Sequence, residues 1–188
     1  NTNGYKNLIK LVSTAFQEGF YYKPRVDKEL LSRYSQDLIA LTASFGGEIP
    51  KHLLNDNIAQ AERSLGEYID IFGKENLYLE LQDHFLPEQK PVNEALVRLS
   101  ESTGLKLVAT NDIHYTNKAD SGPHDVLLCI QTNAMVDDPK RMRFGSQEFY
   151  MKSQEEMGRL FGHIPEALAN SIEIADRCNI KFDFGRSM

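Results

Sequence analysis

Residues 105–115 read LKLVATNDIHY, and this stretch decides how the rest of the chain is interpreted. A mostly apolar run of strand length comes first, and the polar residues Asp112 and His114 follow it at once. Such a run suits a strand buried on both faces, as in a parallel sheet covered by helices. The polar residues then fall at the carboxyl end of that strand, where parallel α/β folds collect their reacting groups.

Two further segments of strand length precede this stretch, at residues 38–43 (LIALTA) and 77–82 (LYLELQ). Helices are predicted between them, at 58–72 and around the apolar positions 92–99, and a glycine closes each. The order β-α-β-α-β, with helices long enough for crossovers, predicts a parallel sheet wound right-handed. Three strands do not close a barrel, so the fold class is α/β with an open sheet or part of a barrel.

Both ends of the chain are predicted to be helical. An amino-terminal helix spans residues 5–20, and a short one follows from Asp27 to Tyr34. Beyond Tyr115 the pattern is mostly helical, with an apolar turn at 125–130 and a capping box that begins at Ser153. Each of two helices carries an apolar stripe that is expected to be buried. The stripes consist of Tyr5, Leu8, Val12, Ala15 and Phe16 in the first helix, and of Leu168, Ile172, Ala175 and Cys178 in a final helix that begins at Pro165.

The composition and charge of the chain exclude several classes of function. The chain has 188 residues, 41% of them hydrophobic and 26% charged, which fits one globular domain. Its net charge of −6 argues against a free-standing nucleic-acid binder. No apolar run approaches the roughly 18–20 residues of a membrane span, and the first residues lack the pattern of a signal peptide. Two cysteines without CxxC spacing favour a reducing compartment, and we expect a cytoplasmic protein without a membrane partner.

Asp112 and His114 are the best candidates for chemistry. In an extended segment, residues two apart point the same way, so a carboxylate oxygen and an imidazole nitrogen could ligate one metal ion. The competing interpretation is an ordinary polar loop in which Asp112 caps the following segment, and without further context it is the favoured one.

Three other features are weaker candidates for a functional role. Ser44, before Gly46-Gly47, ends a predicted strand, and the turn either holds a phosphate or simply starts a helix. Glu80 and Gln82 share one face of a strand, as a functional pair or as an exposed edge. His84 resembles a ligand only superficially.

The basic runs at 20–25 and 140–143 could touch phosphates, although solvated loops are the simpler interpretation in an acidic chain. His124 is interpreted as a cap or loop contact, and His52 and His163 as surface residues. The sequence contains no nucleophile elbow, P-loop or GxGxxG motif.

Eight strings of the chain together resemble a known family, the polymerase-and-histidinol-phosphatase (PHP) domains of bacterial DNA polymerase III alpha subunits. Each string is modest alone, but their order and spacing are specific and they cover essentially all residues. The strings are NTNGYKNLIKLVS, EGFYYKPRVDKELL, LYLELQDH, LVATNDIHY, HDVLLCIQT, DDPKRMRF, EFYMKSQEEM and PEALANSIEIADRCNI.

The resemblance implies a distorted PHP-type β/α barrel with a metal cleft at the strand ends. In that superfamily the cleft holds divalent ions (Zn, Mn or Mg) and cleaves phosphoester bonds, in some members as a 3′–5′ exonuclease. Asp112 and His114 fall on the family's late DxH metal motif. Metal-assisted hydrolysis fits these residues, because metals lower the pKa of bound water and clamp phosphate oxygens.

Three departures qualify that expectation. The family's HxH motif and its amino-terminal strands are expected before residue 1, and the polymerase palm beyond Met188. Ser44 stands where the family has a cysteine ligand, and serine is a poor zinc ligand. We therefore expect a single partial PHP domain over residues 1–188, with a barrel portion at 1–132 and a helical portion at 133–188 that leads toward the polymerase core.

The resemblance also implies a parent protein that is a DNA-directed DNA polymerase (a nucleotidyltransferase) acting in DNA replication. Its partners are the rest of the alpha subunit, other replicase subunits and, through the parent, DNA. No catalytic residue is assigned in this chain, no phosphate-binding residue is known, and the chain alone is expected to be inactive. Two alternatives stay open: a stand-alone PHP-superfamily phosphoesterase, and a catalytically dead scaffold for structure or interaction.

Two physical expectations follow from the missing strands. An open sheet edge with apolar flanks predicts a homo-oligomer or an edge covered by the termini. Two ligands are fewer than the three protein ligands usual for a catalytic zinc, so metal is expected to be absent or weakly held.

Overall fold

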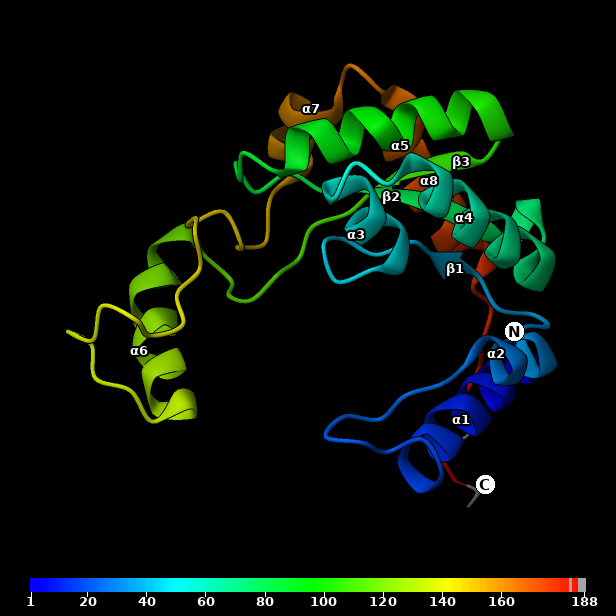
Figure 1. Cartoon of the computed structure of the whole chain (residues 1–188), viewed down its shortest axis with the longest axis horizontal. Helices are drawn as coiled ribbons and strands as arrows, with labels where there is room; N and C mark the ends of the chain where they lie inside the picture. The colour runs from blue at the N-terminus through cyan, green and yellow to red at the C-terminus, as the bar shows by residue number, and fades with distance from the viewer. Residues whose placement is uncertain (183, 186–188) are drawn as a thin grey trace.

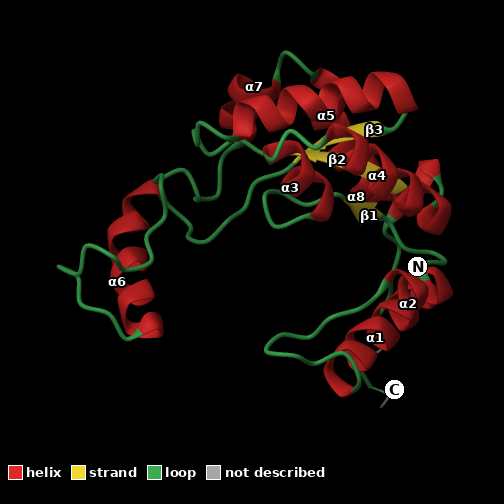
Figure 2. Cartoon of the chain, in the orientation of Figure 1, coloured by secondary structure: helices red, strands yellow, loops and turns green. Residues whose placement is uncertain are grey.

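The structure, a computed structural model, describes residues 1–182 and 184–185. At its centre is a parallel three-stranded sheet in the order β1 (Ala40–Leu41), β2 (Leu77–Leu81) and β3 (Lys106–Ala109). Ala40 is paired with Leu77, and Tyr78 with Lys106. The predicted α/β class and the parallel sheet with helical crossovers are confirmed (Figure 2).

Three helices connect the strands and cover the sheet. Helices α3 (Glu48–Leu54) and α4 (Ile58–Phe72) lie between β1 and β2, and α5 (Gln89–Thr103) lies between β2 and β3. Gly73 and Gly104 end the last two with φ of 75° and 74°, which a residue without Cβ adopts at little cost. The apolar core is built from these helices, the strands and two residues of the carboxyl-terminal part of the chain, Phe161 and Ala167. Its most buried members are Ile49, Ala61, Leu65, Leu77, Leu79, Leu81, Leu96, Leu105 and Ala167.

Alternation along β2 separates the two sheet faces. Leu77, Leu79 and Leu81 belong to the apolar core, while Tyr78 and Glu80 lie on the opposite face. On that face the Tyr78 hydroxyl donates to Glu173 at 2.9 Å.

Helix α8 (Pro165–Arg177) closes the β3 side of the sheet. Its Asn170 amide donates to the Leu107 carbonyl at 2.7 Å, which satisfies a backbone group on the outer edge of β3. The Glu173 carboxylate accepts from Lys106 at 2.7 Å. The predicted stripe of α8 is wrong in part. Leu168 packs against the core, but Ile172 and Cys178 are exposed, and the buried residue of the helix is Ala167.

The amino-terminal helices α1 (Thr2–Gln17) and α2 (Lys28–Tyr34) form an arm beside the sheet (Figure 1). Helix α1 is where expected, but most of its predicted apolar stripe is exposed. Gly4, Leu11 and Ala15 are its buried residues. The Gly4 position decides this rotation, because a Cβ there would lie 2.0 Å from the carbonyl oxygen of Asp37.

A second arm contains α6 (Ser121–Thr132) and the loop after it, and lies on the other side of the molecule (Figure 1). The loop is tied to α6 by a bidentate ion pair, in which Arg141 donates to both Asp125 oxygens, at 2.6 Å to Oδ1 and 2.5 Å to Oδ2. Helix α7 (Gln154–Phe161) then begins with the capping box predicted at Ser153.

The first strand is shorter than the sequence predicted. Only Ala40 and Leu41 pair with β2, and both are half-buried instead of covered on two faces. Asp37 and Ala43 have φ of 62° and 61°, so the extended backbone cannot continue past them.

Among the described residues, no helix combines the length and apolar character that crossing a bilayer requires. The boundary predicted between residues 132 and 133 stays a prediction.

Candidate functional site

The carboxyl ends of β2 and β3 bring the candidate residues to one edge of the sheet. β2 runs into Gln82, Asp83 and His84, while β3 runs into Asn111, Asp112 and His114. Because neighbouring parallel strands point the same way, residues 28 positions apart in sequence meet here. The Asp112 backbone N–H donates to His84 Nε2 at 3.2 Å.

Asp112 and His114 lie side by side, as the spacing predicted. His114 Nε2 is 3.2 Å from Asp112 Oδ1. The His114 side chain is 38% exposed, and the Asp112 side chain is 50% exposed. A carboxylate oxygen and an imidazole nitrogen are therefore presented together to solvent, in reach of one ion.

His84, whose sequence context resembles a ligand cluster only superficially, is the buried anchor of this edge. Its residue is only 1% exposed, and its ring stacks on Phe149 with centroids 4.3 Å apart. Nδ1 lies 2.9 Å from the side-chain amide nitrogen of Gln89, and Nε2 accepts a hydrogen bond from the Asp112 N–H.

Burial lowers the pKa of His84, and the nearby Lys152 ammonium lowers it further. The imidazole is therefore held neutral and serves as a fixed support for the Asp112 backbone.

Residues 149–151 clamp the segment that carries His114. The Phe149 carbonyl accepts from the His114 N–H at 2.8 Å, and the Met151 N–H donates to the Tyr115 carbonyl at 3.2 Å. Tyr115 and Tyr150 form a parallel bridge. No sequence pattern signalled this contact, which joins segments about 35 residues apart.

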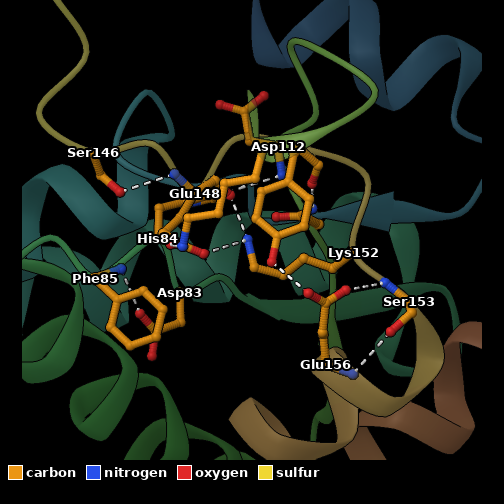
Figure 3. A network of polar contacts seen from close by, with 12 residues as sticks. Asp83, His84, Phe85, Asp112, Ser146, Glu148, Lys152, Ser153 and Glu156 are labelled. Atoms are coloured by element: carbon orange, nitrogen blue, oxygen red, sulfur yellow. Dashed lines mark hydrogen bonds and ion pairs between the residues drawn. The ribbon is translucent and has the colours of Figure 1, made fainter. Parts of the chain in front are cut away.

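A polar network lies behind this clamp (Figure 3). The Lys152 side chain is only 2% exposed and its ammonium bonds the Glu148 backbone carbonyl, while the Glu148 carboxylate lies 3.5 Å away. Burial lowers the pKa of Lys152, although Glu148 opposes this effect. The Tyr150 hydroxyl donates to Glu156 at 2.6 Å, which raises the pKa of Tyr150 to about 12 and helps lower that of Glu156 to about 2.

Glu80 and Gln82 share one sheet face, as predicted, and are linked to Thr110. The Thr110 hydroxyl donates to Glu80 at 2.5 Å, and the Gln82 amide donates to Thr110 at 3.0 Å. Ser44 lines a small cavity with Glu80 and Gln82, whereas Asp112 and His114 are not among its lining residues. The structure therefore joins Ser44 to the Glu80 cluster and not to the Asp112–His114 pair.

The donor set tests whether a divalent ion fits this edge. Within residues 1–182 and 184–185, no three His, Cys, Asp or Glu side chains gather in a way that could hold a metal. Asp112 and His114 thus offer two donors, fewer than the three protein ligands usual for a catalytic zinc. The described residues alone do not make a complete metal site.

Comparison with known proteins gives this geometry a family context. Residues 1–84 match the PHP domain family. The chain is 45% identical over 181 residues to DNA polymerase III subunit alpha of Treponema pallidum, over 96% of this chain and 16% of the relative. It is 45% identical to the subunits of the same name from Thermus aquaticus, over 98% of this chain, and Borreliella burgdorferi, over 95%. The chain spans 15–16% of the length of these relatives, and the resemblance seen in the sequence is confirmed.

Proposed function

We propose that this chain serves as a PHP-domain segment of a DNA polymerase III alpha subunit. Residues 1–84 match the PHP domain family, and nearly the whole chain is similar to such subunits. The observation that carries this proposal is the similarity over 95–98% of the chain to three alpha subunits. The protein to which the segment belongs is then a DNA-directed DNA polymerase of the bacterial cytoplasm that works with other replicase subunits.

Within that protein, Asp112 and His114 contribute two ligands to a divalent-metal site of the PHP type. The support is their 3.2 Å approach and their exposure at the carboxyl edge of a parallel sheet. A bound ion would supply an activated water and a clamp for phosphate oxygens. The chain's own residues position the donors: His84 holds the Asp112 backbone, and Phe149 holds that of His114.

A segment exchange tests the proposal. The segment of the Thermus aquaticus alpha subunit that aligns with this chain is replaced by it, and primer extension is measured. We expect extension by the exchanged protein and none by the 188-residue chain alone. Extension by the chain alone would overturn the assignment, as would an exchanged protein that folds but does not bind primed DNA.

A scaffold role is the second candidate, favoured by Ser44 at the position of the family's cysteine ligand and by its place in the Glu80 cluster. In the exchanged protein, D112A and H114A distinguish the two roles. A scaffold predicts unchanged metal content in both variants, whereas a metal site predicts loss of bound metal. Light scattering of the chain alone tests the expected homo-oligomer.

A further inference from the structure

Residues 148–152 form a short segment on which the candidate site depends. The Phe149 carbonyl accepts from the His114 N–H at 2.8 Å, and Tyr150 forms an isolated bridge with Tyr115. The three-stranded sheet does not include this segment. In the part of the chain that the structure describes, no ladder of strand hydrogen bonds therefore fixes its position, so side-chain contacts are needed to hold it.

A buried lysine at the end of the segment supplies those contacts. In an extended chain, residues 148, 150 and 152 point the same way. The Lys152 ammonium lies 4.4 Å from the centroid of the Tyr150 ring, donates to the Glu148 carbonyl and is 3.5 Å from Glu148 Oε2 (Figure 3). The Lys152 side chain thus spans the segment from its last residue back to its first.

The Glu148 carboxylate joins the segment to the root of the α6 arm. Glu148 Oε1 accepts from Lys118, in the short helix η2 (Lys118–Asp120) that precedes α6. The Glu148 side chain is 12% exposed and that of Lys152 only 2%, whereas that of Lys118 is 55% exposed. The two oxygens of one buried carboxylate therefore face two ammonium groups, one buried and one at the surface.

Stability is a weak explanation for this buried pair of charges. Removing an ammonium and a carboxylate from water costs free energy that their attraction often fails to offset, and apolar residues of similar volume are frequently at least as stabilising. Hydrogen bonds to charged groups, however, require one geometry, whereas apolar contacts accept several. The pair is therefore better suited to fixing the position of the segment than to stabilising the fold.

We propose that Lys152 and Glu148 are positioning residues of the candidate site, which act through Phe149 on His114. The His114 N–H is bonded to the Phe149 carbonyl, and the two rings lie 5.8 Å apart between centroids. A shift of the segment therefore moves both the backbone anchor of His114 and the surroundings of its imidazole. The inference deepens the proposed function and rests on it for one point, the metal-binding role of His114.

The double variant E148M/K152M separates positioning from stability. It approximately keeps the volume of both side chains while removing both charges, and Lys118 is exposed enough for water to replace its partner. Urea denaturation of the 188-residue chain should give an unfolding midpoint close to that of the parent or higher.

Hydrogen exchange measured by NMR on the same chain reports the position of the segment. The amides of His114 and Met151, which bond the segment to the strand end, should lose about tenfold protection in E148M/K152M. Thr110, whose N–H donates to the Leu81 carbonyl at 3.0 Å, should keep its protection. Nuclear Overhauser contacts between the His114 and Phe149 rings should weaken.

E148Q is the milder variant, because it keeps the shape of the side chain and one acceptor oxygen. We expect a loss of protection of a few-fold at His114 and none at Thr110. The control is E155Q/R159Q, which removes an exposed ion pair with the same spacing of four residues and should leave the His114 amide as protected as in the parent.

Unchanged protection of the His114 amide in both E148M/K152M and E148Q, or a loss shared equally by Thr110, would overturn the positioning role. The metal content of the exchanged protein tests the remaining link, and E148M/K152M should lower it. Loss of amide protection with unchanged metal content supports the positioning role and rejects its connection to a metal site. Primer extension enters neither measurement, so failure of this inference and failure of the proposed function are told apart.

Discussion

Replacing Glu48 by glutamine should loosen the joint between the amino-terminal arm and the helices that cover the sheet. The carboxylate lies in the first turn of α3, where it accepts from Lys28 of α2 at 2.8 Å and from Ser64 of α4 at 2.7 Å. Its second oxygen accepts from the Tyr68 hydroxyl at 3.0 Å. One side chain therefore links three helices, and E48Q keeps its shape while removing the charge.

The magnitude follows from the pKa of Glu48. Burial alone would raise it, but the hydrogen bonds from Lys28, Ser64 and Tyr68 lower it from 4.5 to about 2. That difference sets a ceiling of about 3 kcal/mol on the stabilisation. Because the Glu48 side chain is 36% exposed, solvent screening reduces the expected loss in E48Q to about 1–2 kcal/mol.

The sign of the pH dependence is fixed by the lowered pKa. The contribution of Glu48 is fully present above the unfolded value near 4.5 and is lost as the pH falls toward 2. Urea denaturation at pH 7 and at pH 2.5 measures it. E48Q should be less stable than the parent at pH 7, and the difference should shrink at pH 2.5.

E67Q is the matched control, because Glu67 bonds the same Lys28 but its side chain is 48% exposed. It should cost less than E48Q, about 0.5 kcal/mol or below. Equal stability of E48Q and the parent at pH 7, or a difference that does not change between the two pH values, would refute the argument.

Three further outcomes are expected. L65A removes a fully buried core side chain and should lower the free energy of unfolding by about 3 kcal/mol, measured by urea denaturation. R141K loses the bidentate bond to Asp125, so limited proteolysis should cut the loop after α6 faster than in the parent. In E156Q the pKa of Tyr150 should fall from about 12 toward its ordinary value of 10.0, as followed by ultraviolet titration of the phenol; an unchanged titration would show that Glu156 is not its partner.

The local pattern of the sequence was enough for most elements. Helix α4, the capping box at Ser153 and the glycines that close α4 and α5 are properties of neighbouring residues, and they lie where the periodicity put them. The parallel order of the strands also followed, because two crossovers of sufficient length leave little choice of topology.

Rotation of a helix about its axis was less predictable. Helix α1 has enough apolar residues for two different stripes, and the close approach of Gly4 to the Asp37 backbone selects the one with Leu11 and Ala15 inside. Sequence periodicity does not contain that contact. For α8 likewise, bonds to Tyr78 and Lys106 turn Glu173 toward the sheet and leave Ile172 exposed.

In the candidate site, likewise, the sequence predicted some features and only the tertiary structure decided others. The i, i+2 spacing of Asp112 and His114 after a strand was sufficient to place both side chains together, since strand geometry is local. The role of His84 depends on the register of β2 against β3, which brings it to the Asp112 backbone. The support from Phe149 depends on how a segment about 35 residues downstream folds back on the strand ends. Contacts of that kind come from packing and charge pairing between distant segments, and only the tertiary structure decides them.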